Sequence, residues 1–241
     1  MKVYVSDLKE GKIDTLFFVL RKEELVSGEI YIFRDKTGII EGFYSGKSEI
    51  NENDFVQVIG DVVQSNGKLK INIQKIEKID ESKIDIFDFL PSTKRNINEM
   101  MTELNEIIES IKDENLKSLL KIVFNEKFIE SFKLCPGAVY YHHNYLGGLL
   151  EHTLSVARIC EEISKFYGLN RDLLVAGALL HDIGKTREYE WFPKFSVTKE
   201  GGFSGHAALG AHMLSKVIPD GFPEDLKIKL YHMILSHHGE M

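Results

Sequence analysis

The stretch Ala176-Gly177-Ala178-Leu179-Leu180-His181-Asp182-Ile183-Gly184-Lys185 ends an apolar run that begins at Leu173 and carries no charge before Asp182. Such a run predicts a buried helix. A buried charge is costly unless it is paired or bound to a metal, so the adjacent His181 and Asp182 indicate a cation. The alternative is an ordinary helix end, with Asp182 at the solvent edge and Gly184 as the C-terminal cap. The histidines elsewhere in the sequence favour the cation.

Histidines occur on or beside the apolar faces of four predicted helices. In chain order they are His152, His181, His206 and the pair His237-His238. The first of these helices is expected to bury a stripe formed by His152, Val156, Ile159, Ile163 and Phe166. A single inward histidine is more often a hydrogen-bonded core residue than a ligand. Histidines on four separate helices are better explained together, by convergence on metal.

This combination of side chains predicts a centre with two divalent ions, drawn from Mn, Mg, Fe, Co, Ni and Zn. Imidazole binds most of these ions, and a carboxylate can bridge two of them. Two ions about 3.5–4 Å apart can clamp both oxygens of an in-line phosphoryl displacement and generate hydroxide from water near neutral pH. The sequence therefore favours a metal-dependent enzyme that acts on phosphate esters.

The first part of the chain has the alternation of apolar and polar residues that is typical of strands. The alternation is clearest in 28–34, 54–60 and 68–74, and turn signals at 35–38, 45–46 and 65–67 separate the segments. About five short strands in so short a segment predict a small barrel, of which the OB-fold is the commonest with an oligonucleotide-binding face. Its aromatic residues either stack on bases or fill the barrel. They are Tyr31, Phe33, Phe43 and Tyr44, of which Tyr31 and Phe33 are the candidates for substrate binding.

The expected fold class is α+β and multidomain. An OB-like β-barrel that binds nucleic acid is expected over residues 1–82, a linker over 83–95, and a helical domain over 96–241. Pro91 and Ser92 mark the boundary.

The composition is that of a soluble globular protein, with 43% hydrophobic and 28% charged residues. The early apolar run Leu16–Leu20 is too short for a signal peptide or a membrane span, so a cytoplasmic location without membrane contact is expected. Cys135 and Cys160 lack C-x-x-C spacing and indicate neither a disulfide framework nor a cysteine metal site. The net charge of −7 means that nucleic-acid contact must be local, short or metal-assisted.

The order of these motifs resembles the HD-domain superfamily of metal-dependent phosphohydrolases, whose dinuclear members carry further histidines after the His-Asp pair. The local sequences are similar to those of the YhaM family, bacterial 3′-5′ exoribonucleases with an N-terminal OB-fold and an HD domain. The similar stretches are 142–153, 181–188, 205–206 and 236–240. The resemblance spans nearly the whole chain, strongly from Met100 onward and weakly over the barrel.

This resemblance implies a role for each motif residue. One metal would be held by His152, His181 and Asp182, with Asp182 bridging to a second ion. The second ion would be bound by His206, His237 and His238. Lys185 would contact the scissile phosphate as metal-activated hydroxide releases nucleoside monophosphates from the 3′ end of single-stranded RNA, or of DNA. His142 and His143 either contact the substrate or cap a helix, and Arg187 is a further candidate for substrate binding.

One departure from the family concerns the end of the sequence. The family's pattern finishes with a further Asp on a helix beyond the His-His pair, whereas this sequence finishes at Met241. Either the sequence is a fragment or the protein lacks that ligand; three protein ligands and a water can still hold zinc. Two alternative functions remain open: hydrolysis of free nucleotides, and non-catalytic binding of nucleic acid beside an incomplete metal site. The sequence is compatible with a homo-oligomer.

Overall fold

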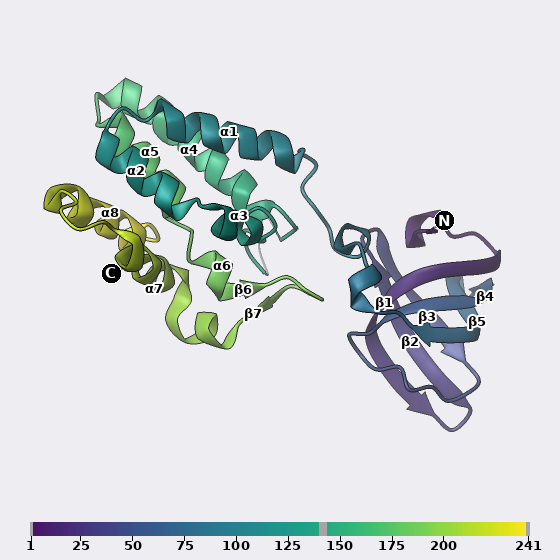
Figure 1. The fold of residues 1–241 in the computed structure, drawn as a ribbon. Coiled ribbons are helices and arrows are strands. Elements are labelled where there is room, and N and C mark those ends of the chain that lie inside the picture. The colour runs from purple at the N-terminus through teal and green to yellow at the C-terminus, as the bar shows by residue number, and fades with distance from the viewer. Residues whose placement is uncertain (1, 140–143, 240–241) are drawn as a thin grey trace. The chain divides into compact units, whose positions relative to one another are not determined.

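A computed structural model describes residues 2–139 and 144–239, and the chain divides into two compact units, Met1–Pro91 and Ser92–Met241 (Figure 1). The first unit is built from strands and the second almost entirely from helices. The predicted fold class, a small OB-like barrel followed by a helical domain, is confirmed.

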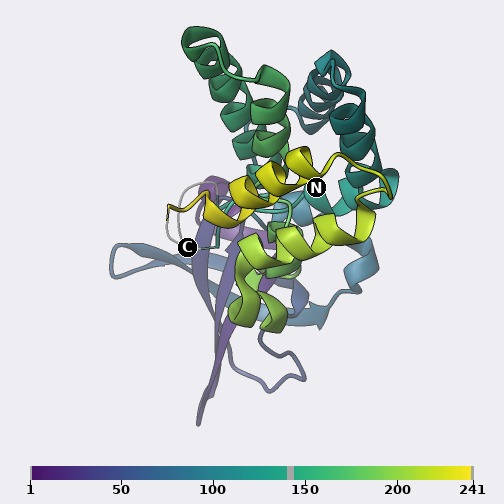
Figure 2. The same ribbon diagram turned by 90° about the vertical axis from the view of Figure 1, so that its left-hand side faces the viewer.

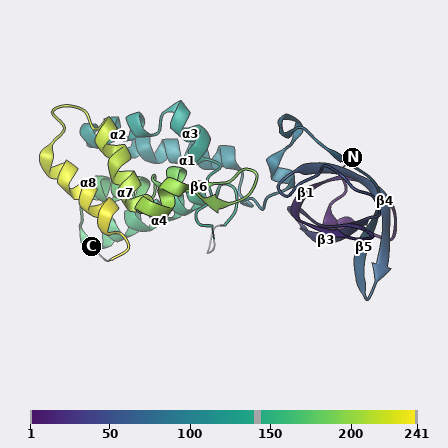
Figure 3. The ribbon, with the colours of Figure 1, turned by 90° about the horizontal axis from the view of Figure 1, so that it is seen from below.

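Five strands form a closed barrel in the order β1-β2-β3-β5-β4 (Figure 3). They are β1 (Gly11–Leu25), β2 (Gly28–Asp35), β3 (Gly38–Tyr44), β4 (Phe55–Ser65) and β5 (Lys68–Lys78). All neighbours are antiparallel except β3 and β5, which pair in parallel. Pairing of β1 with β4 closes the ring, so each strand has two neighbours and the barrel has no free edge.

The barrel interior is filled by large side chains, among them Phe17, Tyr31 and Phe33, all with no exposed surface. Phe33 stacks on both other rings, with centroids 5.2 Å from Phe17 and 5.4 Å from Tyr31. The prediction that Tyr31 and Phe33 contact substrate is therefore wrong, because neither ring is accessible to a base. Alternation along β2 places both side chains on one face, and barrel closure makes that face the interior.

Tyr31 also links the core to a buried polar group. Its hydroxyl donates a hydrogen bond of 2.6 Å to the carboxylate of Glu29, which is itself 2.9 Å from the ammonium of Lys22. Burial and the neighbouring Glu29 raise the pKa of Tyr31, which keeps the hydroxyl protonated as a donor. The pairing satisfies a carboxylate that has only 2% of its surface exposed.

Short 3-10 turns flank the barrel strands at Val5–Asp7, Glu81–Lys83 and Ile86–Asp88. The last of these brings Phe89 onto the outside of the barrel, where it packs against Phe18 and Phe55. Residues 86–89 thus belong to the packing of the first unit.

The second unit begins with three helices, α1 (Ile97–Ser110), α2 (Glu114–Val123) and α3 (Glu126–Phe132) (Figure 2). The elements that follow are α4 (Gly148–Tyr167), α5 (Arg171–Leu180), α6 (Lys185–Glu188), β6 (Tyr189–Glu190), β7 (Ser196–Val197), α7 (Lys199–Val217) and α8 (Glu224–Ser236). Side-chain oxygens accept hydrogen bonds from backbone N–H groups at the start of α1, α2, α3, α5 and α7, which fixes where these helices begin. Among residues 2–139 and 144–239, no helix has the length and apolar character needed to cross a bilayer.

Helix α4 packs differently from the predicted stripe. Its buried side chains include Leu150, Leu154 and Ala157. The expected stripe is exposed beyond Val156, with exposed fractions of 59% at Ile159 and 82% at Phe166. The helix has two apolar faces, and spacing alone does not tell which of them meets the core.

Candidate metal centre

The apolar run singled out in the sequence forms α5, whose residues Val175–Leu180 are all buried. The helix ends at Leu180, and the following turn presents His181 and Asp182, which are 8% and 2% exposed. Asp182 is thus not at the solvent edge, and the reading of this motif as an ordinary helix end is wrong. The prediction of a buried helix is confirmed.

Gly184 allows α7 to approach this turn closely. A Cβ atom at position 184 would lie 2.0 Å from the carbonyl oxygen of His206 and 2.5 Å from the backbone nitrogen of Gly210. Any side chain at 184 would therefore push α7 away. Immediately before His206, Gly205 adopts φ +69° and interrupts α7, so a new helical run starts at His206. The two glycines together set His206 beside Asp182.

The first group of ligand atoms comes from α4 and the turn after α5. The Nε2 atoms of His152 and His181 lie 3.3 Å apart. Oδ2 of Asp182 lies 3.4 Å from the first and 3.0 Å from the second of these nitrogens. Three atoms that can bind a metal therefore face a common point.

A second group comes from α7 and the turn that follows α8. Nε2 of His206 lies 3.3 Å from Nε2 of His237 and 2.8 Å from Nε2 of His238. The other carboxylate oxygen of Asp182, Oδ1, lies 3.5 Å from both His206 and His237. Asp182 thus stands between two groups, one facing each of its oxygens.

These spacings match those of metal ligands. Two nitrogens each about 2.0–2.1 Å from a tetrahedral ion are about 3.4 Å apart. In the described residues, Oδ1 of Asp182 is buried and accepts no hydrogen bond, although a buried carboxylate oxygen normally has a partner. A second cation would supply that partner, so the residues present fit a two-metal centre.

The charges at the centre shift the pKa values of three candidate ligands, and the shifts differ in direction. Burial would raise the pKa of Asp182, but its interactions with His181 and His237 and the charge of Lys185 outweigh burial and hold that pKa well below its usual range. Burial lowers the pKa of His238, and His237 and His206 lower it further. Burial would lower the pKa of His237 too, but its interaction with Asp182 raises it.

Three of the imidazoles are oriented through their outer nitrogens. Nδ1 of His181 lies 2.7 Å from the carbonyl oxygen of Ala178, and Nδ1 of His237 lies 2.8 Å from that of Ile234. Nδ1 of His206 lies 2.8 Å from Oε2 of Glu188. Each contact places the proton on Nδ1 and leaves the Nε2 lone pair for a metal.

Glu188 is the residue that sequence reasoning did not identify. It lies at the end of α6 and reaches His206 because Gly184 brings α7 close to that helix. Its position three residues after Lys185 is visible in the sequence, but its partner lies 18 residues further on, so the contact depends on how the helices pack.

The remaining candidates lie in different places. The Lys185 ammonium lies 2.7 Å from Oδ2 of Asp182, within the centre. Arg187 instead pairs with Glu200 and lines a separate hollow beside Phe128, Met213 and Val217. His142 and His143 lie outside the described residues.

Comparison with known proteins adds an independent finding. Residues 149–241 match the HD domain family. A Geobacillus protein named 3′-5′ exoribonuclease YhaM is 31% identical over 217 residues, which cover 87% of this chain and 67% of that protein. The Bacillus subtilis protein of the same name is 31% identical and covers 87% of this chain and 69% of its own length. The Listeria welshimeri protein of that name is 27% identical over 100% of this chain and 81% of its own length.

Among solved structures, a chain of the replication protein A heterotrimer bound to ssDNA aligns with 33% of this chain at 20% identity. Its TM-score is 0.29, which is too low to support a conclusion about function.

Proposed function

The chain belongs to the YhaM family of 3′-5′ exoribonucleases, and from this we propose that its histidine centre removes nucleoside monophosphates from the 3′ end of single-stranded RNA. The HD domain implies dependence on divalent metal. We propose that the same centre also trims single-stranded DNA by the same chemistry. An RNA substrate is consistent with a cytoplasmic location. That the protein forms a homo-oligomer stays a prediction.

We assign one ion to His152, His181 and Oδ2 of Asp182. A second ion would be held by Oδ1 of Asp182 and the Nε2 atoms of His206, His237 and His238. Divalent ions at these places would act as Lewis acids on the phosphate and on the attacking water. What supports the pairing most directly is the position of the buried Asp182 carboxylate. It lies between the pair His152 and His181 and the group of three histidines at 206, 237 and 238, and its Oδ1 lacks a hydrogen bond among the described residues.

The protein side chains have separate tasks in this scheme. Asp182 keeps the two groups of ligand atoms at fixed positions relative to each other. The hydrogen bonds of Nδ1 in His181, His206 and His237 fix the orientations of these rings. We propose that the Lys185 ammonium, held at the centre by Asp182, contacts a non-bridging oxygen of the scissile phosphate and stabilises the charge that develops on it.

The polarity of trimming tests this function. Purified protein is incubated with Mn²⁺ and single-stranded RNA that carries a label either at the 5′ end or at the 3′ end. We expect the 3′ label to appear at once as mononucleotide, and the 5′ label to pass through a ladder of shortening products. Release of the 5′ label as mononucleotide before any ladder of shorter RNA appears, or hydrolysis of free nucleotides without any shortening of RNA, would contradict the proposal.

Glu188 offers a prediction about metal affinity. Replacing it by Ala removes the carboxylate that orients His206, so we expect the affinity for one of two ions to fall about 10- to 100-fold. Glu188→Gln keeps an oxygen that can accept the Nδ1 proton and should lose less. Equilibrium dialysis against limiting Mn²⁺, followed by elemental analysis, measures both. The control is Glu200→Gln, which removes an exposed carboxylate paired with Arg187. Unchanged binding of both ions by Glu188→Ala would show that Glu188 has no role in positioning.

A further inference from the structure

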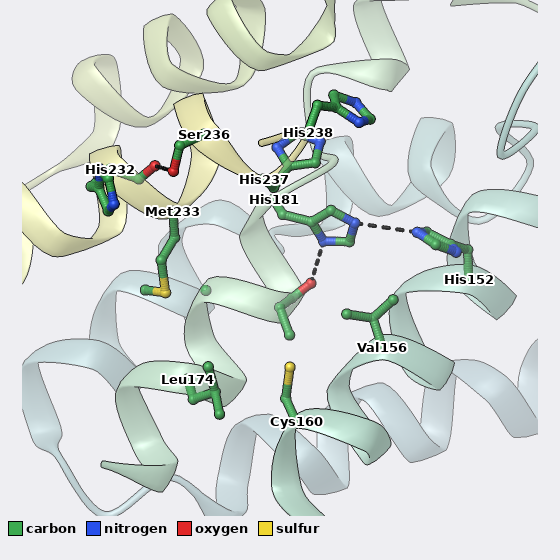
Figure 4. Close-up of a pocket in the computed structure, with 12 residues that line it drawn as sticks. His152, Val156, Cys160, Leu174, His181, His232, Met233, Ser236, His237 and His238 are labelled. Carbon is green, nitrogen blue, oxygen red and sulfur yellow. Dashed lines mark hydrogen bonds between the residues drawn. The ribbon is translucent and has the colours of Figure 1, made fainter. Parts of the chain in front are cut away.

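A hollow of about 450 Å³ lies at the β6–β7 hairpin, and nothing in the assignment above uses it. The residues that line this hairpin hollow are Thr186, Tyr189, Glu190, Trp191, Phe192 and Thr198. The pocket in Figure 4 is a different one, because candidate metal ligands form its polar side and it belongs to the centre already described. Those ligands are His152, His181, His237 and His238. The hairpin hollow contains none of them.

The hairpin hollow begins directly beside the metal centre in the chain. Thr186 follows Lys185, whose ammonium lies 2.7 Å from Oδ2 of Asp182. Tyr189, the first residue of β6, follows Glu188, which orients one of the ligand histidines. Adjacent Cα atoms are about 3.8 Å apart, so an RNA strand bound at the centre needs only a short extension to reach the hollow.

The three rings of the hairpin hollow are held in place by the rest of the helical unit. Tyr189 and Trp191 are partly buried against the helical core, and Phe192 is 39% exposed. The base of the hairpin is fixed by Thr198, whose backbone N–H donates a hydrogen bond of 2.9 Å to the carbonyl oxygen of Glu188. Rings that are already ordered lose little conformational freedom when a ligand stacks on them.

The lining of the hairpin hollow favours a nucleobase over a phosphate. The hydroxyls of Thr186 and Thr198 already donate hydrogen bonds to backbone carbonyl oxygens, and Glu190 adds an exposed carboxylate that repels phosphate. Aromatic faces stack on every base, because every base has a π-face. Lys194 in the hairpin loop and Lys199 at the start of α7 are exposed, and their charges suit the phosphates on either side of a stacked base.

We propose that the hairpin hollow stacks an unpaired base of the RNA strand upstream of the scissile phosphate, on the rings of Trp191 and Phe192. This inference rests on the proposed function and adds to it a contact with the part of the strand that is not being cleaved. A base within a duplex cannot enter the hollow without leaving its stack and its pair. The contact therefore selects single strands, and a substrate too short to reach the hairpin loses it.

Trp191 provides a probe that does not depend on catalysis. It is the only tryptophan in the sequence, so tryptophan fluorescence reports on the hairpin hollow alone. The Mn²⁺-loaded protein is mixed rapidly with single-stranded RNA, and the fluorescence is followed before mononucleotide is released. We expect RNA to quench the fluorescence to a saturable extent. An abasic chain of the same length, which keeps the phosphates and lacks the bases, should leave it unchanged, and so should a blunt-ended RNA duplex.

Variants at position 192 test the contact in the reaction. Phe192→Ala is expected to raise KM for RNA about five- to hundredfold, the usual effect of removing a ring that stacks on one base. Hydrolysis of bis(p-nitrophenyl) phosphate, a diester too small to reach the hairpin, should be unchanged. Phe192→Tyr keeps a ring and should retain the wild-type KM.

The matched control is Phe166→Ala, which removes an 82% exposed ring of α4 that does not line the hairpin hollow. It should trim RNA with the wild-type KM. Circular dichroism and Mn²⁺ content establish that each variant keeps its fold and its metal.

The outcomes separate this inference from the proposed function. Absence of quenching by RNA, or equal quenching by the abasic chain, in protein that trims RNA overturns the stacking assignment alone. So does Phe192→Ala that keeps its metal and trims RNA with an unchanged KM. Quenching by RNA and not by the abasic chain, in protein that does not shorten RNA, supports the stacking site and contradicts the proposed function. A protein that neither shortens RNA nor shows quenching contradicts both.

Discussion

Asp182→Asn is expected to release both cations and to slow RNA trimming about a thousandfold or more. The two carboxylate oxygens face separate groups of histidines, and an uncharged amide presents one oxygen and one NH₂ group in their place. One group then loses its oxygen ligand and both lose the negative charge. Losing about 4 kcal/mol of the transition-state stabilisation that metals supply corresponds to a factor of about a thousand in rate.

The measurement pairs single-turnover kinetics on labelled RNA with elemental analysis of the dialysed protein. Asp220→Asn, a substitution of an exposed Asp in the loop before α8, is the control and should behave as the wild type. Circular dichroism establishes that the variant is folded. An Asp182→Asn protein that keeps both ions, or that trims RNA within about tenfold of the wild-type rate, would be incompatible with a bridging carboxylate.

Lys185→Met is expected to lower kcat about 100- to 1,000-fold while the metal content is retained. Methionine keeps most of the apolar length of the side chain but removes the ammonium that is proposed to contact the scissile phosphate. That ammonium also lies 2.7 Å from Oδ2 of Asp182. Its removal leaves the carboxylate more available to a cation, so the affinity for metal should stay the same or rise.

This combination of results separates two roles for Lys185. If the ammonium mainly held Asp182 in place, the variant would lose metal together with activity. Lys127→Met, which alters an exposed residue of α3, controls for the loss of one positive charge. A Lys185→Met protein that has normal metal content and an unchanged kcat would remove Lys185 from the mechanism.

Several features of this molecule could be predicted because they depend on local pattern. Alternating apolar and polar residues and turn signals were sufficient to predict the barrel. The uncharged run before Asp182 was sufficient to predict the buried helix α5. The convergence of histidines from α4, α7 and the end of α8 followed from their repeated appearance beside apolar positions. The structure brings these imidazoles together around Asp182.

Other features depend on which face of an element meets the core, and the pattern does not contain that information. Tyr31 and Phe33 are two residues apart on β2 and so lie on one face of the strand, which the sequence allows to be either the surface or the interior. Closure of the barrel makes that face the interior. Ile159 and Phe166 have the spacing of a core stripe, but the core lies against the other apolar face of α4. Glu188 could not be assigned because its contact with His206 exists only where Gly184 lets two segments approach.

The central claim is that two cations lie on either side of the Asp182 carboxylate. Anomalous diffraction from crystals grown with Mn²⁺, recorded above and below the Mn absorption edge, tests it directly. We predict two anomalous peaks about 3.5–4 Å apart, one beside His152 and His181 and the other beside His206, His237 and His238. A Mn²⁺-saturated crystal with no peak at Asp182, or with a single peak that contacts only one of the two groups, would contradict the two-metal centre.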